Sequence, residues 1–390
     1  MLSTLRHQLE HHFREQQRFA EGYSPLYARL FAIVADWLAG DAADPVVDWL
    51  LAAAAERPPF DVTLLLMAAL HRDVLAHEPA MAELGRYFMT DVVGLPSADT
   101  LRAAVLARRD ALGEFIRTAN VQTNETGRGL AWLLPAACFG WPAVHLVELG
   151  ASAGLNLVAD RRVYRLADAA DPSQTLLQLG AGSPQFTTLM RDDGALPASV
   201  TVPTILSRTG GDVRPFHLRT PDDELTLASF IWGDQPQRLA RLREGVAALR
   251  AVEQSADGSP LVRLAALNLP DELPRFLAEQ LPRPLDAPVV LYNTVVTLYL
   301  PDHGASLRGM VAEWAERLSV PVLWLQWEPW WGGPPPPGKE WMAWTADYWP
   351  NDGQGDSCRP AARYHLAWVH PHGAALEWAA GWPEFLRKTM

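Results

Sequence analysis

The residue types and spacing best suited to chemistry occur in residues 144–160, VHLVELGASAGLNLVAD. An apolar run ends at Glu148, and Gly150 and Gly154 precede a second apolar segment that we predict to be helical. A strand, a glycine turn and a helix in that order form the first half of a βαβ unit. Gly150 permits a sharp turn and a close approach to a ligand, and free N–H groups at the start of a helix attract a carboxylate or phosphate. We therefore expect a ligand site here.

The spacing of this stretch narrows the kind of ligand. Gly154 is not followed by the lysine that a P-loop requires, and Gly150 and Gly154 are too far apart for the dinucleotide fingerprint. The remaining pattern resembles the first motif of class I S-adenosylmethionine-dependent methyltransferases, although Ser152 replaces a central glycine. A purely structural turn is the alternative. The resemblance implies S-adenosylmethionine as cofactor, with these cofactor-binding candidates: Glu148, Gly150, Ser152, Gly154 and Asn156.

A second acid supports the same interpretation. Residues 202–207 form a predicted strand, and the sequence RTGGD then places Asp212 just beyond its end. In nucleotide-binding folds, an acid near the end of the second strand receives the ribose hydroxyls. We predict that role for Asp212. The alternative is a Gly-Gly-Asp turn in which the carboxylate bonds its own backbone.

A dense polar stretch, NVQTNETGR at residues 120–128, lies between two predicted helices. A simple explanation is that Thr123 or Asn124 caps the helix that follows. However, one cap does not require so many polar side chains. We therefore also predict a polar wall of the site, with these substrate-binding candidates: Gln122, Asn124, Glu125 and Arg128.

The ends of two later strands supply the catalytic candidates. Residues 289–296 and 320–327 are strand-length apolar runs, with Asn293 near the end of the first and Trp327-Glu328 at the end of the second. Substrates of open α/β sheets bind outside the carboxyl ends of the strands. We predict Glu328 as general base, Asn293 as its catalytic partner and Trp327 as a substrate-binding residue. A turn or salt-bridge role for Glu328 is the alternative.

Residues 327–349 hold six of the chain's 16 tryptophans and the tetraproline 334–337. This stretch could form an aromatic wall for a flat or cationic substrate, or a surface for a partner. Alternatively, it is a loop that packs its own aromatic side chains. The histidine pairs at positions 7 and 11 and at 370 and 372 lack further ligands at motif spacing, so we predict no metal site.

The elements that must position these residues change character along the chain. We predict that residues 1–140 are helical throughout, with helices that start at Ser24-Pro25 and Asp44-Pro45. From residue 141 strands and helices alternate, and residues 364–379 resemble an antiparallel hairpin. We predict a helical domain at 1–140 and a Rossmann-like, methyltransferase-type α/β domain with a C-terminal antiparallel hairpin at 141–390.

Composition sets the cellular context. The 390-residue chain has a formal net charge of -12 and two cysteines. The negative charge argues against a nucleic-acid or anionic-membrane surface, and no apolar run approaches the roughly 20 residues of a membrane span. We expect a cytoplasmic protein with a small-molecule substrate and no nucleic-acid or membrane partner. The oligomeric state stays open.

Four stretches together resemble one uncharacterised bacterial family, a domain of unknown function related to the methyltransferases: SPLYARL (24–30), QTNETGR (122–128), ELGASAGLNLVAD (148–160) and RTGGDVRP (208–215). The resemblance implies a methyltransferase acting on a small molecule. The alternatives are a non-catalytic protein of the same fold that binds a nucleoside-containing ligand, and an interaction module that uses the Trp/Pro-rich stretch. One departure is at Ala265, where such enzymes tend to carry an acid beside adenine.

Overall fold

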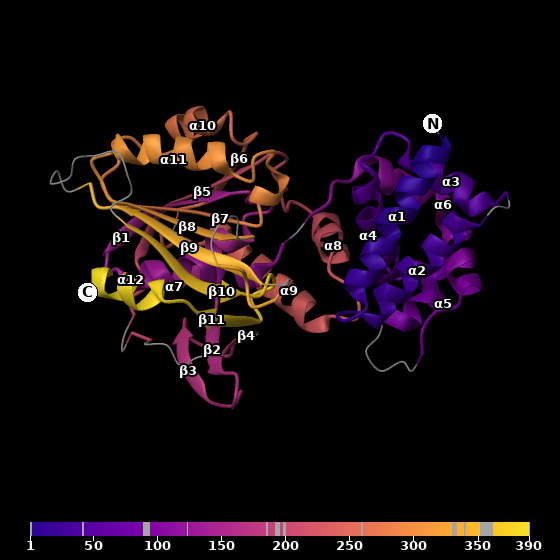
Figure 1. The fold of residues 1–390 in the computed structure, drawn as a ribbon, viewed down its shortest axis with the longest axis horizontal. Coiled ribbons are helices and arrows are strands. Elements are labelled where there is room, and N and C mark those ends of the chain that lie inside the picture. Colours follow the sequence, from indigo (N-terminus) through magenta and orange to yellow (C-terminus); the bar gives the residue numbers. More distant parts are fainter. Residues whose placement is uncertain are drawn as a thin grey trace. The chain divides into compact units, whose positions relative to one another are not determined.

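The computed structural model describes residues 2–40, 43–88, 94–122, 124–184, 186–191, 196–197, 200–258, 260–329, 334–338, 341–351 and 362–389. The chain forms two compact units (Figure 1): residues 1–123 with 218–239, and residues 124–217 with 240–390. The predicted combination of an N-terminal helical region with a mixed α/β sheet is confirmed. Trp330, Trp331 and Cys358 lie outside the described residues.

The first unit is helical throughout its described residues. Its helices are α1 (Leu2–Ala20), α2 (Pro25–Ala39), α3 (Pro45–Ala54), α4 (Pro59–Leu75), α5 (Ala82–Gly85), α6 (Ala98–Thr118) and α8 (Pro221–Ser229), with 3₁₀ turns η1 (Pro79–Met81) and η2 (Arg86–Phe88). The predicted caps are confirmed. Ser24 Oγ accepts the N–H of Tyr27 at 3.2 Å, and Asp44 Oδ1 accepts the N–H of Val46 at 2.9 Å.

Residues 218–239 belong to this helical unit although they come between strands of the sheet. The ring of Trp232 stacks on Tyr27 with 4.7 Å between centroids. Close by, Ser24 Oγ donates to Asp234 Oδ2 at 2.5 Å. These contacts join residues about two hundred positions apart, and no local sequence pattern indicates them.

The second unit is built on one eleven-stranded sheet, in the order β3-β2-β4-β11-β10-β9-β8-β7-β1-β5-β6. The strands are β1 (Ala143–Leu149), β2 (Tyr164–Asp168), β3 (Thr175–Leu179), β4 (Thr187–Met190), β5 (Thr204–Asp212), β6 (Val262–Ala266), β7 (Val289–Thr294), β8 (Val322–Glu328), β9 (Met342–Trp349), β10 (Ala362–Val369) and β11 (Ala375–Trp378). Strands β6, β5, β1, β7 and β8 are mutually parallel. Strands β8 to β11 form an antiparallel meander that ends in the predicted hairpin.

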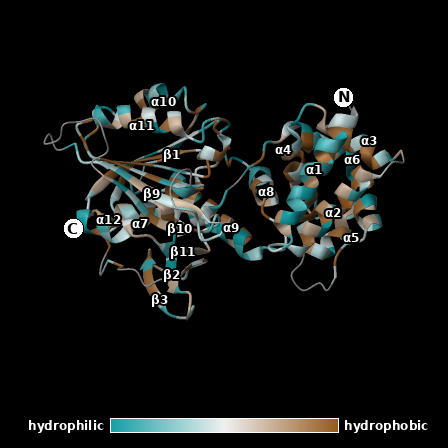
Figure 2. Cartoon of the chain, in the orientation of Figure 1, coloured by the Kyte–Doolittle hydropathy of each residue, from teal (hydrophilic) through white to brown (hydrophobic). Residues whose placement is uncertain are grey.

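Helices cover both faces of the parallel strands (Figure 1). On one face α7 (Leu130–Cys138) packs against β7 and β8 and α12 (Gly381–Thr389) against β10, and on the other α10 (Leu273–Gln280) and α11 (Ala305–Glu316) complete a second core. The helix α9 (Pro236–Gln254) begins in the first unit and continues in the second. Figure 2 shows hydrophobic residues along the central strands, whose continuous burial explains their uninterrupted apolar runs.

Several sequence predictions were wrong in detail. The part of the chain between Arg161 and β5 contains β2, β3 and β4, none of which the sequence predicted. The predicted strand 202–207 is longer than expected and continues as β5 to Asp212. Gly210 allows this, because a Cβ at that position would overlap Ala151 and Leu264. The segment after Gly154 is the 3₁₀ helix η4 (Leu155–Arg161) and not an α-helix. Arg241, predicted to lie on a solvated face, is buried.

The described part of the Trp/Pro-rich stretch is also not the loop that was one of its predicted forms. Residues 342–349 form β9, which pairs antiparallel with β8 and β10. The side chains of Trp341, Trp344 and Trp349 are buried in the sheet's own core. Among the described residues, no helix combines the length and apolar character needed to cross a bilayer.

Candidate functional site

The order of the parallel strands creates a switch point beside β1. After β1 the chain first forms β2, β3 and β4 at the far edge of the sheet, then β5 and β6 on one side of β1, and later β7 and β8 on the other. Helices that follow the strands on opposite sides diverge at such a point, and ligands of open α/β sheets bind in the crevice outside the carboxyl ends of these strands. The strand ends at Leu149, Asp212 and Thr294 therefore define the candidate site.

The glycine turn follows β1 directly. Gly150, Ser152 and Gly154 all have left-handed backbone conformations, with φ of +79°, +48° and +71°. Such φ values cost little for glycine but are unusual for serine. A Cβ on Gly150 would overlap the side chain of Val296, which follows β7. The turn thus needs Gly150 both for its backbone and for the packing of the neighbouring loop.

Asp212 fixes this turn to the end of β5. Its Oδ2 accepts the N–H of Ser152 at 2.8 Å, and its Oδ1 accepts the N–H of Arg214 at 2.9 Å. The bond to Arg214 closes a local turn, which is the alternative role that the sequence suggested for Asp212. A carboxylate has about four lone-pair sites, so each oxygen can accept a further hydrogen bond. The side chain is half-buried at the edge of the crevice.

Glu148 is the most perturbed acid of the site. Burial raises the pKa of this carboxyl to about 8 from its ordinary value of 4.5, and the nearby charge of Asp212 also raises it. The side chains of Tyr292 and Asn156 and the charge of Arg128 lower the pKa, but they do not offset the loss of water. A buried acid with a strongly raised pKa in a crevice indicates a functional site.

Four buried polar atoms near this acid have no hydrogen-bond partner of good geometry: Oε2 of Glu148, Oδ1 of Asn156, the hydroxyl of Tyr292 and Nδ2 of Asn124. Tyr292 lies on β7 beside Glu148 in register, and Asn156 belongs to η4. Tyr292 and Asn156 interact with the Glu148 carboxyl itself, so the hydrogen bonding of this group is incomplete rather than absent. Buried polar groups are almost always fully bonded, so water or a polar ligand is expected to complete these bonds.

The polar stretch predicted to lie beside the glycine turn is partly found there. Asn124 Oδ1 accepts the N–H of Ala153 at 3.4 Å, and the carbonyl oxygen of Glu125 accepts Nδ2 of Asn156 at 3.4 Å. Residues 124 and 125 thus lie along the turn. Gln122 is buried and belongs to the helical unit. Thr123, the other predicted cap, lies outside the described residues.

The charged members of this stretch have partners within the second unit. The Glu125 carboxylate caps the 3₁₀ helix η3 (Thr126–Gly129) by accepting the N–H of Gly127 at 3.2 Å. It also lies 3.5 Å from Nη2 of Arg241 and 3.4 Å from Nδ1 of His372. Arg128 Nε donates to the carbonyl of Pro371 at 2.8 Å. These contacts fasten the stretch to α9 and to the β10–β11 turn.

The predicted catalytic pair forms a closed network. Glu328 accepts Nδ2 of Asn293 at 2.7 Å, the N–H of Val296 at 2.8 Å and, through Oε2, the N–H and hydroxyl of Thr297 at 3.1 and 2.9 Å. Oδ1 of Asn293 accepts the indole N–H of Trp324 at 2.7 Å. Burial raises the pKa of Glu328, and these hydrogen bonds oppose the increase. The carboxylate holds the loop after β7 in place and keeps no lone pair directed at a ligand.

The remaining predicted residue is buried, whereas three residues that were not predicted are exposed. Trp327 is fully buried and stacks on Trp344 with 5.6 Å between ring centroids. In contrast, Leu298 and Tyr299 form part of the 3₁₀ helix η5 (Thr297–Tyr299), and the Tyr299 side chain is 73% exposed. Val213, directly after Asp212, is exposed as well. Leu298, Tyr299 and Val213 all follow strand ends, which was the available sequence signal. The site residues predicted at those strand ends were mostly polar, so these three were missed.

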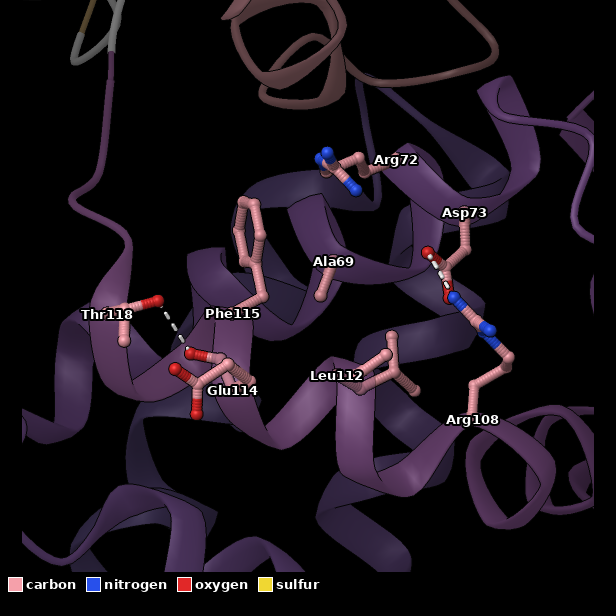
Figure 3. Close-up of a pocket in the computed structure, with 9 residues that line it drawn as sticks. Ala69, Arg72, Asp73, Arg108, Leu112, Glu114, Phe115 and Thr118 are labelled. Atoms are coloured by element: carbon pink, nitrogen blue, oxygen red, sulfur yellow. Dashed lines mark hydrogen bonds and ion pairs between the residues drawn. The ribbon is translucent and has the colours of Figure 1, made fainter. Parts of the chain in front are cut away.

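A cavity of about 280 Å³ lies within the helical unit between α4 and α6 (Figure 3). Its two arginines are already paired. Arg108 Nε donates to Asp73 at 2.7 Å, and Arg72 bonds Asp222. Thr118 donates to the carbonyl of Glu114 at 2.8 Å. The cavity contains none of the predicted site residues and offers a ligand little unpaired charge.

Comparison with known proteins assigns the chain to a family without assigning an activity. The family model described as "Uncharacterized protein conserved in bacteria (DUF2332)" matches residues 10–378, nearly the whole chain. No curated protein and no solved structure matches it.

Proposed function

The chain belongs to this uncharacterised bacterial family, and we propose that it is an S-adenosylmethionine-dependent methyltransferase acting on a small molecule. The observation that carries the proposal is the group of buried polar atoms around Glu148 whose hydrogen bonds within the chain are incomplete, at the switch point of the parallel strands. The strand order β6-β5-β1-β7-β8 corresponds to the order 3-2-1-4-5 of Rossmann-like nucleotide-binding sheets, which supports the cofactor class.

The buried polar atoms around Glu148 fit the amino-acid end of this cofactor. Oδ1 of Asn156 is an acceptor, and Oε2 of Glu148 becomes one when the carboxyl is ionised, so both accept a donor such as an ammonium group, which in turn favours the ionised form. Nδ2 of Asn124 is a donor and requires an acceptor such as a carboxylate. An α-amino acid group offers both.

The ribose end fits Asp212. Each oxygen of this carboxylate keeps lone-pair capacity beyond its one backbone N–H, so it can receive two ribose hydroxyls. When bound, S-adenosylmethionine supplies a methyl group on a positively charged sulfur. The acids Glu148 and Asp212 favour that charge in a crevice of low polarity.

The substrate would contact the exposed residues of the neighbouring loops. Leu298, Tyr299 and Val213 give the carboxyl edge an apolar rim. Glu328 and Asn293 act as positioning residues, because their network holds η5, which carries Leu298 and Tyr299 of this rim. Methyl transfer is an in-line displacement in which orientation dominates, so a fixed rim contributes more than a base with no free lone pair.

A non-catalytic binding protein is the second candidate. It is favoured by the closed hydrogen-bond network of Glu328 and by Ser152 in place of the central glycine. The third possibility is a partner surface on the Trp/Pro-rich stretch. It is less well supported, because the three tryptophans at 341, 344 and 349 are buried. Calorimetric titration with S-adenosylhomocysteine tests the proposal. Methylation of candidate small molecules then separates enzyme from binding protein.

A further inference from the structure

A group of three potential metal ligands lies on α1, in the helical unit. The ligand atoms of His11, His12 and Glu15 all lie within 4.8 Å of one another. Glu15 bridges the two imidazoles: its Oε1 is 3.3 Å from Nε2 of His11, and its Oε2 is 2.9 Å from Nδ1 of His12. The sequence predicted no metal here because Glu15, one turn after His11, was not considered with the histidines.

The distances suit one divalent ion. Two ligands that each lie about 2.1 Å from a tetrahedral zinc ion are roughly 3.4 Å apart. The two measured separations to Glu15 are close to this value. The histidine side chains are 60% and 29% exposed, so the His11 ring can rotate to complete the set while water fills the open positions.

The surroundings keep the ligands available. The Glu15 side chain is 44% exposed, so an ion can reach its carboxylate from solvent. The His12 ring packs edge-to-face on Phe60, with 5.9 Å between ring centroids. This contact fixes the His12 ring while its Nδ1 lies 2.9 Å from Oε2 of Glu15.

We propose that His11, His12 and Glu15 form a surface site for one divalent transition-metal ion of the kind that prefers imidazole and carboxylate ligands, such as Zn²⁺. The ion replaces the proton between His12 and Glu15 and links two successive turns of α1. The site is independent of the proposed methyltransferase function, because its residues and the residues of the crevice belong to different units.

The test is a calorimetric titration of the metal-free full-length chain with ZnCl₂ at pH 7.5. We expect one site that is lost or weakened at least tenfold in His11→Ala, in His12→Ala and in Glu15→Gln. His217→Ala is the matched control, because it removes an exposed histidine from the other unit. Its titration should equal that of the wild type.

Thermal unfolding provides a second measurement. Zn²⁺ should raise the melting temperature of the wild type and of His217→Ala, but not of His11→Ala, because an ion that binds only the folded state stabilises it. Circular dichroism shows whether each variant is folded. The proposal is overturned if His11→Ala and the wild type bind Zn²⁺ equally, or if wild-type binding is weaker than about 1 mM.

Discussion

The carboxylate of Asp212 accepts the backbone N–H of Ser152 at 2.8 Å, and so joins the end of β5 to the turn that follows β1. Ser152 has a left-handed backbone conformation with φ of +48°. A non-glycine residue in this region costs free energy, which surrounding contacts must offset. Asp212 therefore holds the turn in shape, and we propose that the remaining lone pairs of its carboxylate receive the ligand.

Asp212→Ala should weaken binding of S-adenosylhomocysteine at least about tenfold, since each charge-assisted hydrogen bond contributes roughly 1.5–3 kcal/mol and about 1.4 kcal/mol is a decade in affinity. It should also lower the melting temperature, because the N–H of Ser152 loses its partner. Asp171→Ala is the control: that carboxylate also bonds a local turn, between β2 and β3 at the far end of the strand order. Equal affinities in wild type and Asp212→Ala would leave Asp212 as a turn residue only.

Gly150→Ala should destabilise the protein by roughly 1–3 kcal/mol, because a side chain is strained at its φ of +79°. The new Cβ would also overlap Val296. The double variant Gly150→Ala with Val296→Ala should recover part of that loss in urea unfolding. If a ligand also approaches the Gly150 backbone, the double variant should still bind S-adenosylhomocysteine weakly. Full recovery of affinity would make the glycine a packing residue alone.

Glu328→Gln should lower the free energy of unfolding by roughly 1–3 kcal/mol, because an amide nitrogen would face the N–H groups of the loop after β7. Glu313→Gln, an exposed ion-pair partner of Arg317 on α11, should change it far less. A general base would behave differently. It would lose turnover and keep stability, so an unchanged unfolding curve for Glu328→Gln contradicts the positioning role.

The raised pKa of Glu148 predicts a pH-dependent stability. The folded protein binds the carboxyl proton up to pH about 8, whereas the unfolded chain releases it near pH 4.5. The stabilisation from the protonated carboxyl is fully present below pH 4.5 and is lost as pH rises toward 8. Over this range the free energy of unfolding falls by up to about 1.4 kcal/mol per pH unit. Glu148→Gln should remove this slope from urea unfolding at pH 5, 7 and 8.5. Parallel curves for wild type and variant would mean that Glu148 is not buried as an acid.

The sequence was sufficient where local pattern and burial agree. The uninterrupted apolar runs of β7 and β8 matched their complete burial, and Ser24 and Asp44 marked helix starts by their capping chemistry. It was insufficient for β2 to β4, which are only four or five residues long. It also missed the place of residues 218–239, because the stacking of Trp232 on Tyr27 is a purely tertiary contact.

The candidate site shows the same division. Spacing alone selected Glu148, Gly150 and Asp212, because an acid and a glycine after a strand have a recognisable pattern. Tyr292 was missed, since a tyrosine inside a buried strand is typical of core. The role of Glu328 depends on backbone N–H groups of the loop after β7, and no side-chain pattern reveals such partners.

The most direct measurement is calorimetric titration of the full-length wild-type chain with S-adenosylhomocysteine up to millimolar concentration, repeated with Glu148→Gln. The account predicts saturable binding of one ligand per chain, weakened at least about tenfold in the variant, since the ammonium group loses a charged acceptor worth more than 1.4 kcal/mol. Binding by the wild type should also strengthen as pH rises toward 8, because the ionised carboxylate is the form that accepts a cation. An absence of saturable heat in the wild type would contradict the assignment of this crevice to S-adenosylmethionine.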